Sequence, residues 1–245
     1  MGLEIKIFPI GDSAATIELG NCIEDDVNQK IVAMNEWLSL NPFSGLKDII
    51  IAYSSLSVLY DPCTVKKNYP RFSSAFACVH YHLGETFNNS ANSSPQLHRE
   101  IIRMPVCYEE QFGYDLDLIA KEKKISKVDI VRLHCSKVYH VYMVGFLPGF
   151  AYMGKLSEEL ILSRKMRPEQ VTAGSVGITG SQTAIYPMNC PGGWHIIGKT
   201  PIRLFDAYLP VPILLTLGAQ IEFFPISIEE FDHISQTEKD SLAEK

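Results

Sequence analysis

The chain reads Gly145-Phe146-Leu147-Pro148-Gly149-Phe150-Ala151-Tyr152, then Ala173-Gly174-Ser175-Val176-Gly177-Ile178-Thr179-Gly180-Ser181-Gln182-Thr183-Ala184-Ile185-Tyr186-Pro187, then Pro191-Gly192-Gly193-Trp194, and then Ile197-Gly198-Lys199-Thr200-Pro201. Glycine permits backbone at positive φ or in close approach to another group, and proline fixes φ and removes a hydrogen-bond donor. The runs between these four clusters are of β type. The pattern predicts a small barrel or sandwich whose loops are shaped for binding.

Ahead of this segment, the sequence predicts a small α+β domain. Alternating apolar residues and turn residues predict strands, and apolar residues at helical spacing predict two helices. The predicted strands are residues 4–10, 14–19, 46–53 and 55–60, and the predicted helices are residues 25–38 and 69–81. In such a domain, helices cover one face of an antiparallel sheet.

A polar stretch near residue 90 divides the chain. Residues 85–94 have almost nothing to bury, which is typical of a linker. We therefore predict a first domain at 1–86, a linker at 87–95, a second domain at 96–230 and a charged tail at 231–245 that frays.

The second domain is predicted to begin with a strand and two helices. Residues 98–107 form the strand and 116–123 the first helix, and Ser126 followed by Asp129 predicts a capped start for the second helix. The last predicted strands are residues 196–200, 202–205 and 221–225.

Composition excludes several classes of protein. The net charge is −6 and no basic stripe is present, which argues against a nucleic-acid partner. No apolar run is long enough for a membrane span, and the start lacks the pattern of a secretory signal. The six cysteines form no CxxC pair, so we expect a cytoplasmic protein in which they are small buried hydrophobic residues. His80 and His82 lack a third ligand nearby, so no metal site is expected.

Two familiar catalytic patterns do not fit. Ser175 has Ala173 two residues before it, where a nucleophile elbow needs glycine, and the residues after it are of β type rather than helical. No GxGxxG opens a helix and no GxxxxGK[ST] occurs, so the chain has no self-contained nucleotide motif.

The glycine-rich segment does contain candidate binding residues. Uncharged hydrogen-bonding groups lie beside aromatic surface at Gln182, Thr183, Tyr186, Trp194 and His195. These side chains suit either a site for a small polar ligand or an interface with aromatic anchors. They could equally fill a barrel core. The loop with Phe146, Pro148, Gly149 and Phe150 is either a hairpin that packs aromatic rings into the core, which we favour slightly, or the rim of a cleft.

The order GFLPGFxY, GSVGIxGxQTxIYP, PGGWxxIGxTP and LFD resembles the allophanate hydrolase subunit 1 family, which includes 5-oxoprolinase B subunits and the kinase inhibitor KipI. Gly11-Asp12-Ser13 and Tyr60-Asp61-Pro62 extend the resemblance over nearly the whole chain. The resemblance implies a ferredoxin-like N-terminal domain and a cyclophilin-like β-barrel C-terminal domain, together described as a carboxyltransferase domain. It further implies two partners, a homologous C subunit and an A subunit, with which the chain opens 5-oxoproline to glutamate at the expense of ATP.

On this resemblance, Ser175, Gln182, Thr183 and Tyr186 would orient the substrate, and Arg164, Lys165 and Arg167 would bind phosphate. The chain would be inactive alone. Two departures from the family pattern are Thr172 in place of proline and Ala184 in place of glycine, where alanine would be strained if φ were positive. The alternatives are a KipI-like protein that binds a histidine kinase and a component of an allophanate- or urea-degrading amidase.

Overall fold

The computed structural model describes residues 5–20, 23–90 and 101–243. It divides into two compact units, residues 1–97 and residues 98–245. The two units are described separately below. Within the described residues, no helix has the length and apolar character needed to cross a membrane.

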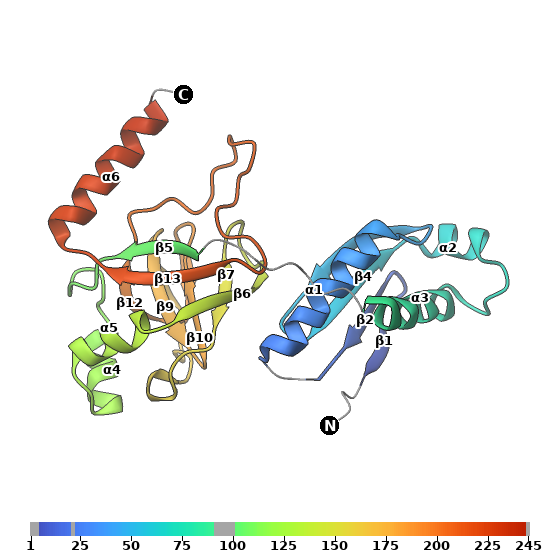
Figure 1. The fold of residues 1–245 in the computed structure, drawn as a ribbon, viewed down its shortest axis with the longest axis horizontal. Helices are drawn as coiled ribbons and strands as arrows, with labels where there is room; N and C mark the ends of the chain where they lie inside the picture. The colour runs from blue at the N-terminus through green and yellow to red at the C-terminus, as the bar shows by residue number, and fades with distance from the viewer. Residues whose placement is uncertain (1–4, 21–22, 91–100, 244–245) are drawn as a thin grey trace. The chain divides into compact units, whose positions relative to one another are not determined.

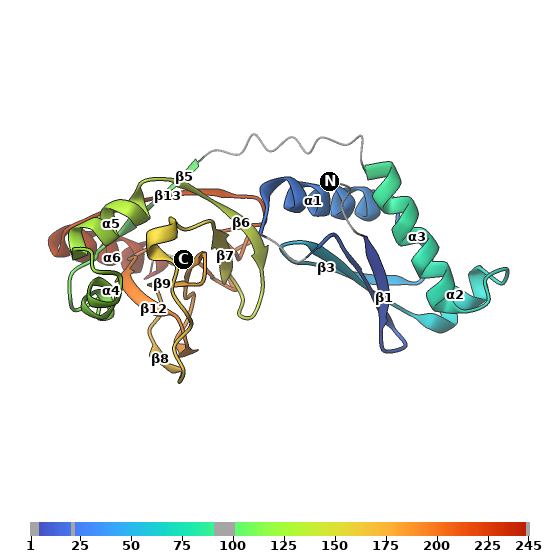
Figure 2. The same cartoon turned by 90° about the horizontal axis from the view of Figure 1, so that it is seen from below.

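The first unit contains a four-stranded antiparallel sheet with the order β1-β2-β4-β3. Its strands are β1 (Lys6–Ile10), β2 (Ala14–Glu18), β3 (Leu46–Ile51) and β4 (Ser55–Tyr60). Helices α1 (Asp25–Leu40) and α3 (Ala75–Ser90) lie against one face of this sheet (Figure 2). The buried side chains of β2 and β4 alternate toward the helices, and Ile17, Leu56 and Val58 are fully buried there.

The predicted helix at residues 69–81 is wrong in its limits. Helix α2 (Pro62–Asn68) comes first, and α3 starts at Ala75. Asp61 caps α2 by accepting hydrogen bonds from the backbone of Cys63 and Thr64, at 2.9 and 3.1 Å. Helix α3 continues through Ser90, so residues 87–90 of the predicted linker are helical, whereas residues 91–95 lie outside the described residues.

The second unit contains a seven-stranded mixed sheet with the order β12-β9-β10-β7-β6-β13-β5 (Figure 1). The strands are β5 (Ile101–Val106), β6 (Val138–Val144), β7 (Ala151–Gly154), β9 (Ser175–Thr179), β10 (Gln182–Ile185), β12 (His195–Lys199) and β13 (Gln220–Pro225). Strands β13 and β5 are parallel, and every other neighbouring pair is antiparallel.

A pair of backbone hydrogen bonds links the two ends of this sheet. Cys107 follows β5 and exchanges bonds of 2.8 and 2.9 Å with Lys199, the last residue of β12. The sheet is therefore a nearly closed barrel, which is one of the two folds, barrel or sandwich, that the glycine and proline clusters predicted. Its interior is filled by apolar side chains that include Val141, Met153 and Ile178.

Three helices complete the second unit. Helix α4 (Leu116–Lys123) agrees with its predicted limits, and α5 (Lys127–Cys135) begins after Ser126 as predicted. Residues 231–243 of the tail that was predicted to fray belong to helix α6 (Ile228–Ala243). Ser227 and Glu230 cap it reciprocally, because the Glu230 N–H donates to Ser227 Oγ at 3.2 Å and the Ser227 N–H donates to Glu230 Oε2 at 2.8 Å.

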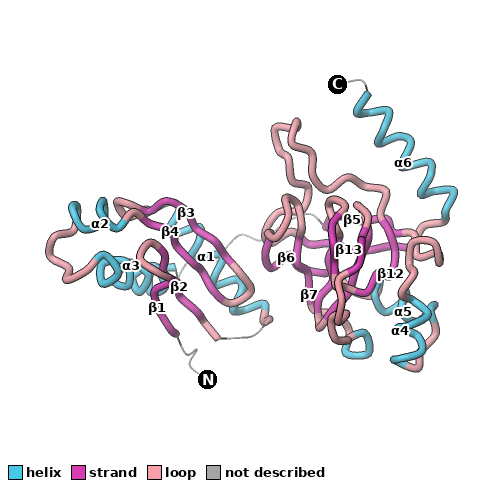
Figure 3. The backbone as a smooth tube through the Cα atoms, turned by 180° about the vertical axis from the view of Figure 1, so that it is seen from behind, coloured by secondary structure: helices cyan, strands magenta, loops and turns pink. Residues whose placement is uncertain are grey.

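The connection between β12 and β13, residues 200–219, contains no helix and no strand and is drawn as loop in Figure 3. The predicted strand at 202–205 forms only one isolated bridge, Phe205 with Ile213. The remaining short elements are the 3₁₀ helix η1 (Glu158–Leu160) and the two-stranded sheet of β8 (Glu169–Val171) with β11 (Cys190–Gly192).

Candidate functional site

A cavity of about 300 Å³ lies on the face of β9 and β10 that points away from the barrel interior. Side chains alternate along β10, so Thr183 and Ile185 are directed to the barrel core, whereas Gln182 and Ala184 are on the opposite face. Gln182 pairs with Thr179 across the β9–β10 hairpin, and both residues line the cavity. The barrel interior and this cavity are therefore separate spaces.

Aromatic rings form the walls of the cavity. Phe150 lies 4.7 Å from Tyr152, 5.2 Å from Tyr186 and 5.7 Å from Trp194, measured between ring centroids. The rings of Tyr152, Tyr186 and Trp194 each meet the Phe150 ring edge to face or tilted, an arrangement that aromatic pairs favour. Phe146 is the exposed member, with 66% of its surface accessible, and its ring is 5.6 Å from that of Phe150. The result is an apolar chamber with one exposed ring at its mouth.

Two polar side chains also reach this chamber. The lining includes Arg164 and Gln182. Among the described residues, neither side chain has a hydrogen-bond partner, and no carboxylate lies within ion-pair distance of Arg164. A cation and an amide that line an aromatic chamber and have no protein partners can bind a small, planar, negatively charged molecule.

The Tyr186 hydroxyl stays protonated at neutral pH. Burial raises the pKa of Tyr186 to about 12, although a hydrogen bond from the Trp194 backbone acts in the opposite direction. Its ring therefore supplies an apolar wall and a neutral hydroxyl rather than a charge.

Several predicted site residues do not reach the cavity. The Lys165 ammonium is 2.8 Å from Asp115 and 2.6 Å from Glu169, and only 11% of the Lys165 side chain is exposed. Burial lowers the pKa of Lys165, but the two carboxylates outweigh it and hold that pKa above its ordinary value. The positive charge of Lys165 is therefore already balanced by two carboxylates of the protein itself. Arg167 is exposed and is not part of the lining.

Three other predicted residues face the protein interior. Thr183 is fully buried, and its hydroxyl is 2.9 Å from His134 Nε2. Ser175 is buried beside Thr172, with their hydroxyl oxygens 3.2 Å apart. The His195 Nε2 is 3.0 Å from the carbonyl oxygen of Ser163, while its buried Nδ1 has no partner among the described residues. These positions make them structural residues of the barrel.

The four residues predicted to form the rim of the cleft differ in their exposure to solvent. Phe146 and Pro148 are exposed, whereas Phe150 is buried and forms a wall of the chamber, and Gly149 is buried at a φ of 81°. Trp194 is also a wall, because only 7% of it is accessible. It is consequently not an exposed interface anchor.

Four lining residues were not among the predicted site residues: Tyr152, Thr179, Pro191 and Gly192. Tyr152 pairs with Ala184 across β7 and β10, and Thr179 pairs with Gln182, so strand register was the signal that could have found these two residues. Ala184 lies within β10 and is absent from the positive-φ residues of the described chain, so alanine is not strained there. Among the described residues, no group of three or more histidine, cysteine, aspartate or glutamate residues could hold a metal ion.

Comparisons with known proteins agree over nearly the whole chain. Residues 5–215 match the family described as "Carboxyltransferase domain, subdomain C and D". The 5-oxoprolinase B subunit of Bacillus subtilis (strain 168) is 38% identical over 233 residues, which cover 94% of this chain and 97% of that protein.

Solved structures give the same result for the fold. A conserved uncharacterized protein from Pyrococcus horikoshii is 33% identical, with a TM-score of 0.53, and the match covers 92% of this chain and 100% of that chain. The urea amidolyase of K. lactis has a TM-score of 0.76 at 17% identity, and the match covers 96% of this chain but 16% of that chain. The second likeness concerns the fold alone.

Proposed function

Because the chain belongs to the family of the carboxyltransferase domain, subdomains C and D, we propose that it is the B subunit of an ATP-dependent 5-oxoprolinase. The complex would convert 5-oxoproline to glutamate, and this chain would be inactive alone. The name of the Bacillus subtilis relative, a B subunit, supports the need for further subunits. We take these to be a homologous C subunit and an A subunit.

The observation that carries this proposal is the presence of Arg164 and Gln182 together in the lining of the aromatic chamber. 5-Oxoproline is a small five-membered lactam with one carboxylate. The guanidinium would bind the carboxylate, and the carboxamide would exchange hydrogen bonds with the lactam C=O and N–H. The rings of Phe150, Tyr152 and Trp194 would cover the faces of the lactam ring. The volume of about 300 Å³ suits a ligand of this size.

The proposed chemistry explains why ATP is required. Amide resonance makes a lactam resistant to water. Transfer of the γ-phosphoryl group of ATP to the lactam oxygen would turn that oxygen into a leaving group. ADP would leave in that transfer. One water would then add to the ring carbon and the C–N bond would break to give an acyl phosphate of glutamate, and a second water would cleave the acyl phosphate to release glutamate and phosphate. In this chain, Arg164 and Gln182 would hold the substrate in a fixed orientation, which is how positioning lowers a barrier. Phosphate binding by Lys165 and Arg167 is not part of this proposal, since neither residue lines the aromatic chamber.

The proposal also assigns each unit to a known type of fold. Four antiparallel strands with α1 and α3 on one face support a ferredoxin-like first unit, and the nearly closed barrel supports a cyclophilin-like second unit. The exposed apolar side chains of Tyr208 and Val211, 95% and 71% accessible, support a contact with another chain of the complex.

The test is reconstitution with purified A and C subunits. Glutamate formation from 5-oxoproline and ATP should require all three chains. Arg164→Ala should lower kcat/KM by about 100-fold or more, because it removes a charge-assisted contact to the substrate. Arg164→Lys should recover part of the loss. Arg132→Ala, which removes an exposed arginine of α5, is the matched control and should leave turnover unchanged.

The outcomes separate this proposal from its alternatives. Turnover by the isolated chain would show that no shared site is needed. No turnover in the complete mixture, together with tight binding to a histidine kinase, would support the inhibitor function. Activity only beside an amidase would support a role in allophanate or urea breakdown.

A further inference from the structure

A second cavity, of about 320 Å³, lies between the end of β12 and the first turns of α6. Its lining includes Lys199 and Thr200 from the strand end, Arg203 from the following loop, and Phe231 and Ser235 from α6. Tyr186 is the single described lining residue that it shares with the aromatic chamber. The two cavities therefore lie on either side of Tyr186 and differ in chemistry.

The charge in this cavity comes from Lys199. Its backbone closes the barrel against Cys107, while its ammonium group donates to Thr172 Oγ1 at 3.2 Å and lies 5.8 Å from the centroid of the Phe112 ring. No carboxylate of the described residues lies within ion-pair distance of that ammonium. This differs from Lys165, which has two carboxylate partners. Burial lowers the pKa of Lys199, which is the expected result when an ammonium group loses water and gains no counter-charge.

The rest of the lining adds positive and neutral groups. Arg203 is the other cation, and its guanidinium is shared with Asp206 at 3.2 Å and with the Phe205 carbonyl at 3.1 Å. Ser235 contributes a hydroxyl group from α6. No aspartate or glutamate is among the described residues that line the cavity. A concave surface with cations and no acidic residue attracts anions.

We propose that this second cavity is a binding site for a small oxyanion, a carboxylate or phosphate group, with Lys199 as its counter-charge and Arg203 and Ser235 as further donors. The anion supplies the charge that the protein does not provide to Lys199. The site is distinct from the aromatic chamber and does not depend on the reaction proposed for it.

The site has a defined dependence on pH. Only the protonated amine attracts an anion, and the pKa of Lys199 is lowered. Anion affinity therefore falls as pH rises, and it falls at a lower pH than an ordinary lysine would give. Bound anion stabilises the ammonium form, so binding takes up protons when part of Lys199 is neutral.

The test is calorimetric titration of the full chain with orthophosphate and, separately, with acetate. We expect one saturable site for orthophosphate, acetate or both. Lys199→Met should weaken binding by about tenfold or more, because it keeps the side-chain volume and removes the charge. Lys199→Arg should retain binding. Lys121→Met removes an exposed lysine of α4 and is the matched control, with affinity unchanged. Phosphate binding without acetate binding identifies phosphoryl compounds as the ligand class, and binding of both extends it to carboxylates.

A second pair of variants keeps the test decisive if Lys199→Met fails to fold. Ser235→Glu places a carboxylate on α6 at the cavity and should abolish anion binding, whereas Ser235→Gln has the same size without charge and should preserve it. Saturable heat from neither anion, or equal affinity in wild type and Lys199→Met, overturns the proposal. The titration needs neither other subunits nor turnover, so a failed 5-oxoprolinase reconstitution leaves its result unaffected.

Discussion

Two adjacent glycines decide where the polar and aromatic groups of the chamber can lie. A Cβ atom at Gly192 would collide with the Tyr186 hydroxyl, and one at Gly193 would be 2.5 Å from Nε of Arg164. The absence of side chains at these two positions lets the ring and the guanidinium approach the backbone. This is a physical reason for the sequence Pro-Gly-Gly-Trp before β12.

Gly193→Ala should therefore displace Arg164 with little effect on folding. The neighbouring atom belongs to the far end of a flexible side chain, which can move at low cost. We expect the KM for 5-oxoproline in the reconstituted complex to rise about tenfold, while the urea midpoint of unfolding stays nearly constant. Steady-state kinetics and urea unfolding measure the two effects. An unchanged KM would mean that Arg164 does not contact the substrate.

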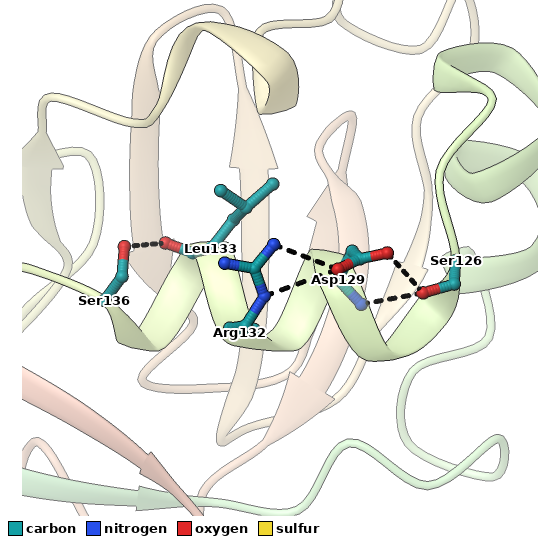
Figure 4. A network of polar contacts seen from close by, with 5 residues as sticks. All are labelled: Ser126, Asp129, Arg132, Leu133 and Ser136. Atoms are coloured by element: carbon teal, nitrogen blue, oxygen red, sulfur yellow. Dashed lines mark hydrogen bonds and ion pairs between the residues drawn. The ribbon is translucent and has the colours of Figure 1, made fainter.

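At the scale of single elements, helix α5 shows how much of its stability is local. Figure 4 shows the polar network along α5, in which the Ser126 hydroxyl accepts a hydrogen bond from the Asp129 N–H at 3.0 Å and donates to Asp129 Oδ2 at 2.7 Å. Arg132 lies one turn further and contacts the same carboxylate at 3.0 Å. At the other end, the Ser136 hydroxyl donates to the carbonyl oxygen of Leu133. The N-terminal half of the network thus satisfies a backbone donor that the helix itself leaves unpaired.

Ser126→Ala should lower the free energy of unfolding by about 1 kcal/mol, the usual cost of removing a serine N-cap. Ser136→Ala is the matched control, because its hydroxyl is exposed and bonds a carbonyl that water can also reach, so a few tenths of a kcal/mol are expected. Urea denaturation followed by circular dichroism compares the two midpoints. Equal losses would show that the N-cap has no special role in α5.

The elements predicted well are those whose signals lie within a few residues. The Ser126-x-x-Asp129 pattern marked the start of α5, and apolar spacing marked α4. The same local reasoning could have found α2 from Asp61-Pro62 and α6 from Ser227-x-x-Glu230, since both are capping signals. The predicted strand at 202–205 failed for another reason. A strand needs a paired neighbour, and this segment finds only Ile213.

The candidate site was predictable only in part, because distant contacts determine which side chains are available. Nothing near Lys165 in the sequence indicates that Asp115, fifty positions away, neutralises it. Thr183 is directed into the barrel by the alternation along β10, and its hydrogen bond there to His134 depends on how α5 packs on the barrel. Gln182 and Tyr186 were identified from residue type and do line the chamber. Arg164 was identified as a cation, but its position beside the aromatic rings depends on a distant contact, in which the backbone N–H of the next residue, Lys165, donates to the Gly193 carbonyl oxygen at 2.9 Å.

At the scale of the whole molecule, each unit has its own spectroscopic reporter. The chain has two tryptophans, of which Trp37 packs in the first unit and Trp194 in the second. The second unit also contains His134, which is fully buried between the Tyr108 hydroxyl at 2.8 Å and the Thr183 hydroxyl at 2.9 Å. Burial lowers the pKa of His134 to about 3.

Acid should therefore destabilise the second unit in a defined pH range. His134 binds a proton in the unfolded chain below pH about 6.5 but remains neutral in the fold until pH about 3. Stability is thus highest above this range and falls as pH drops through it, by up to about 1.4 kcal/mol per pH unit. Trp194 fluorescence in a Trp37→Phe variant should follow this loss during urea unfolding. His134→Gln should flatten the pH dependence, and an equally steep slope in that variant would assign it to other groups.

The way each sheet ends bears on how copies of this chain avoid aggregation. Unpaired strand edges are templates on which other chains can add strands. In the first unit, the edge strand β1 contains Pro9, which has no N–H to offer, and the edge strand β3 has an irregular register at Lys47. In the barrel, the pairing of Cys107 with Lys199 joins the two edge strands to each other. Aggregation of the second unit should therefore begin from molecules in which this join has opened, so any ligand that holds Lys199 in place would also protect the protein in storage.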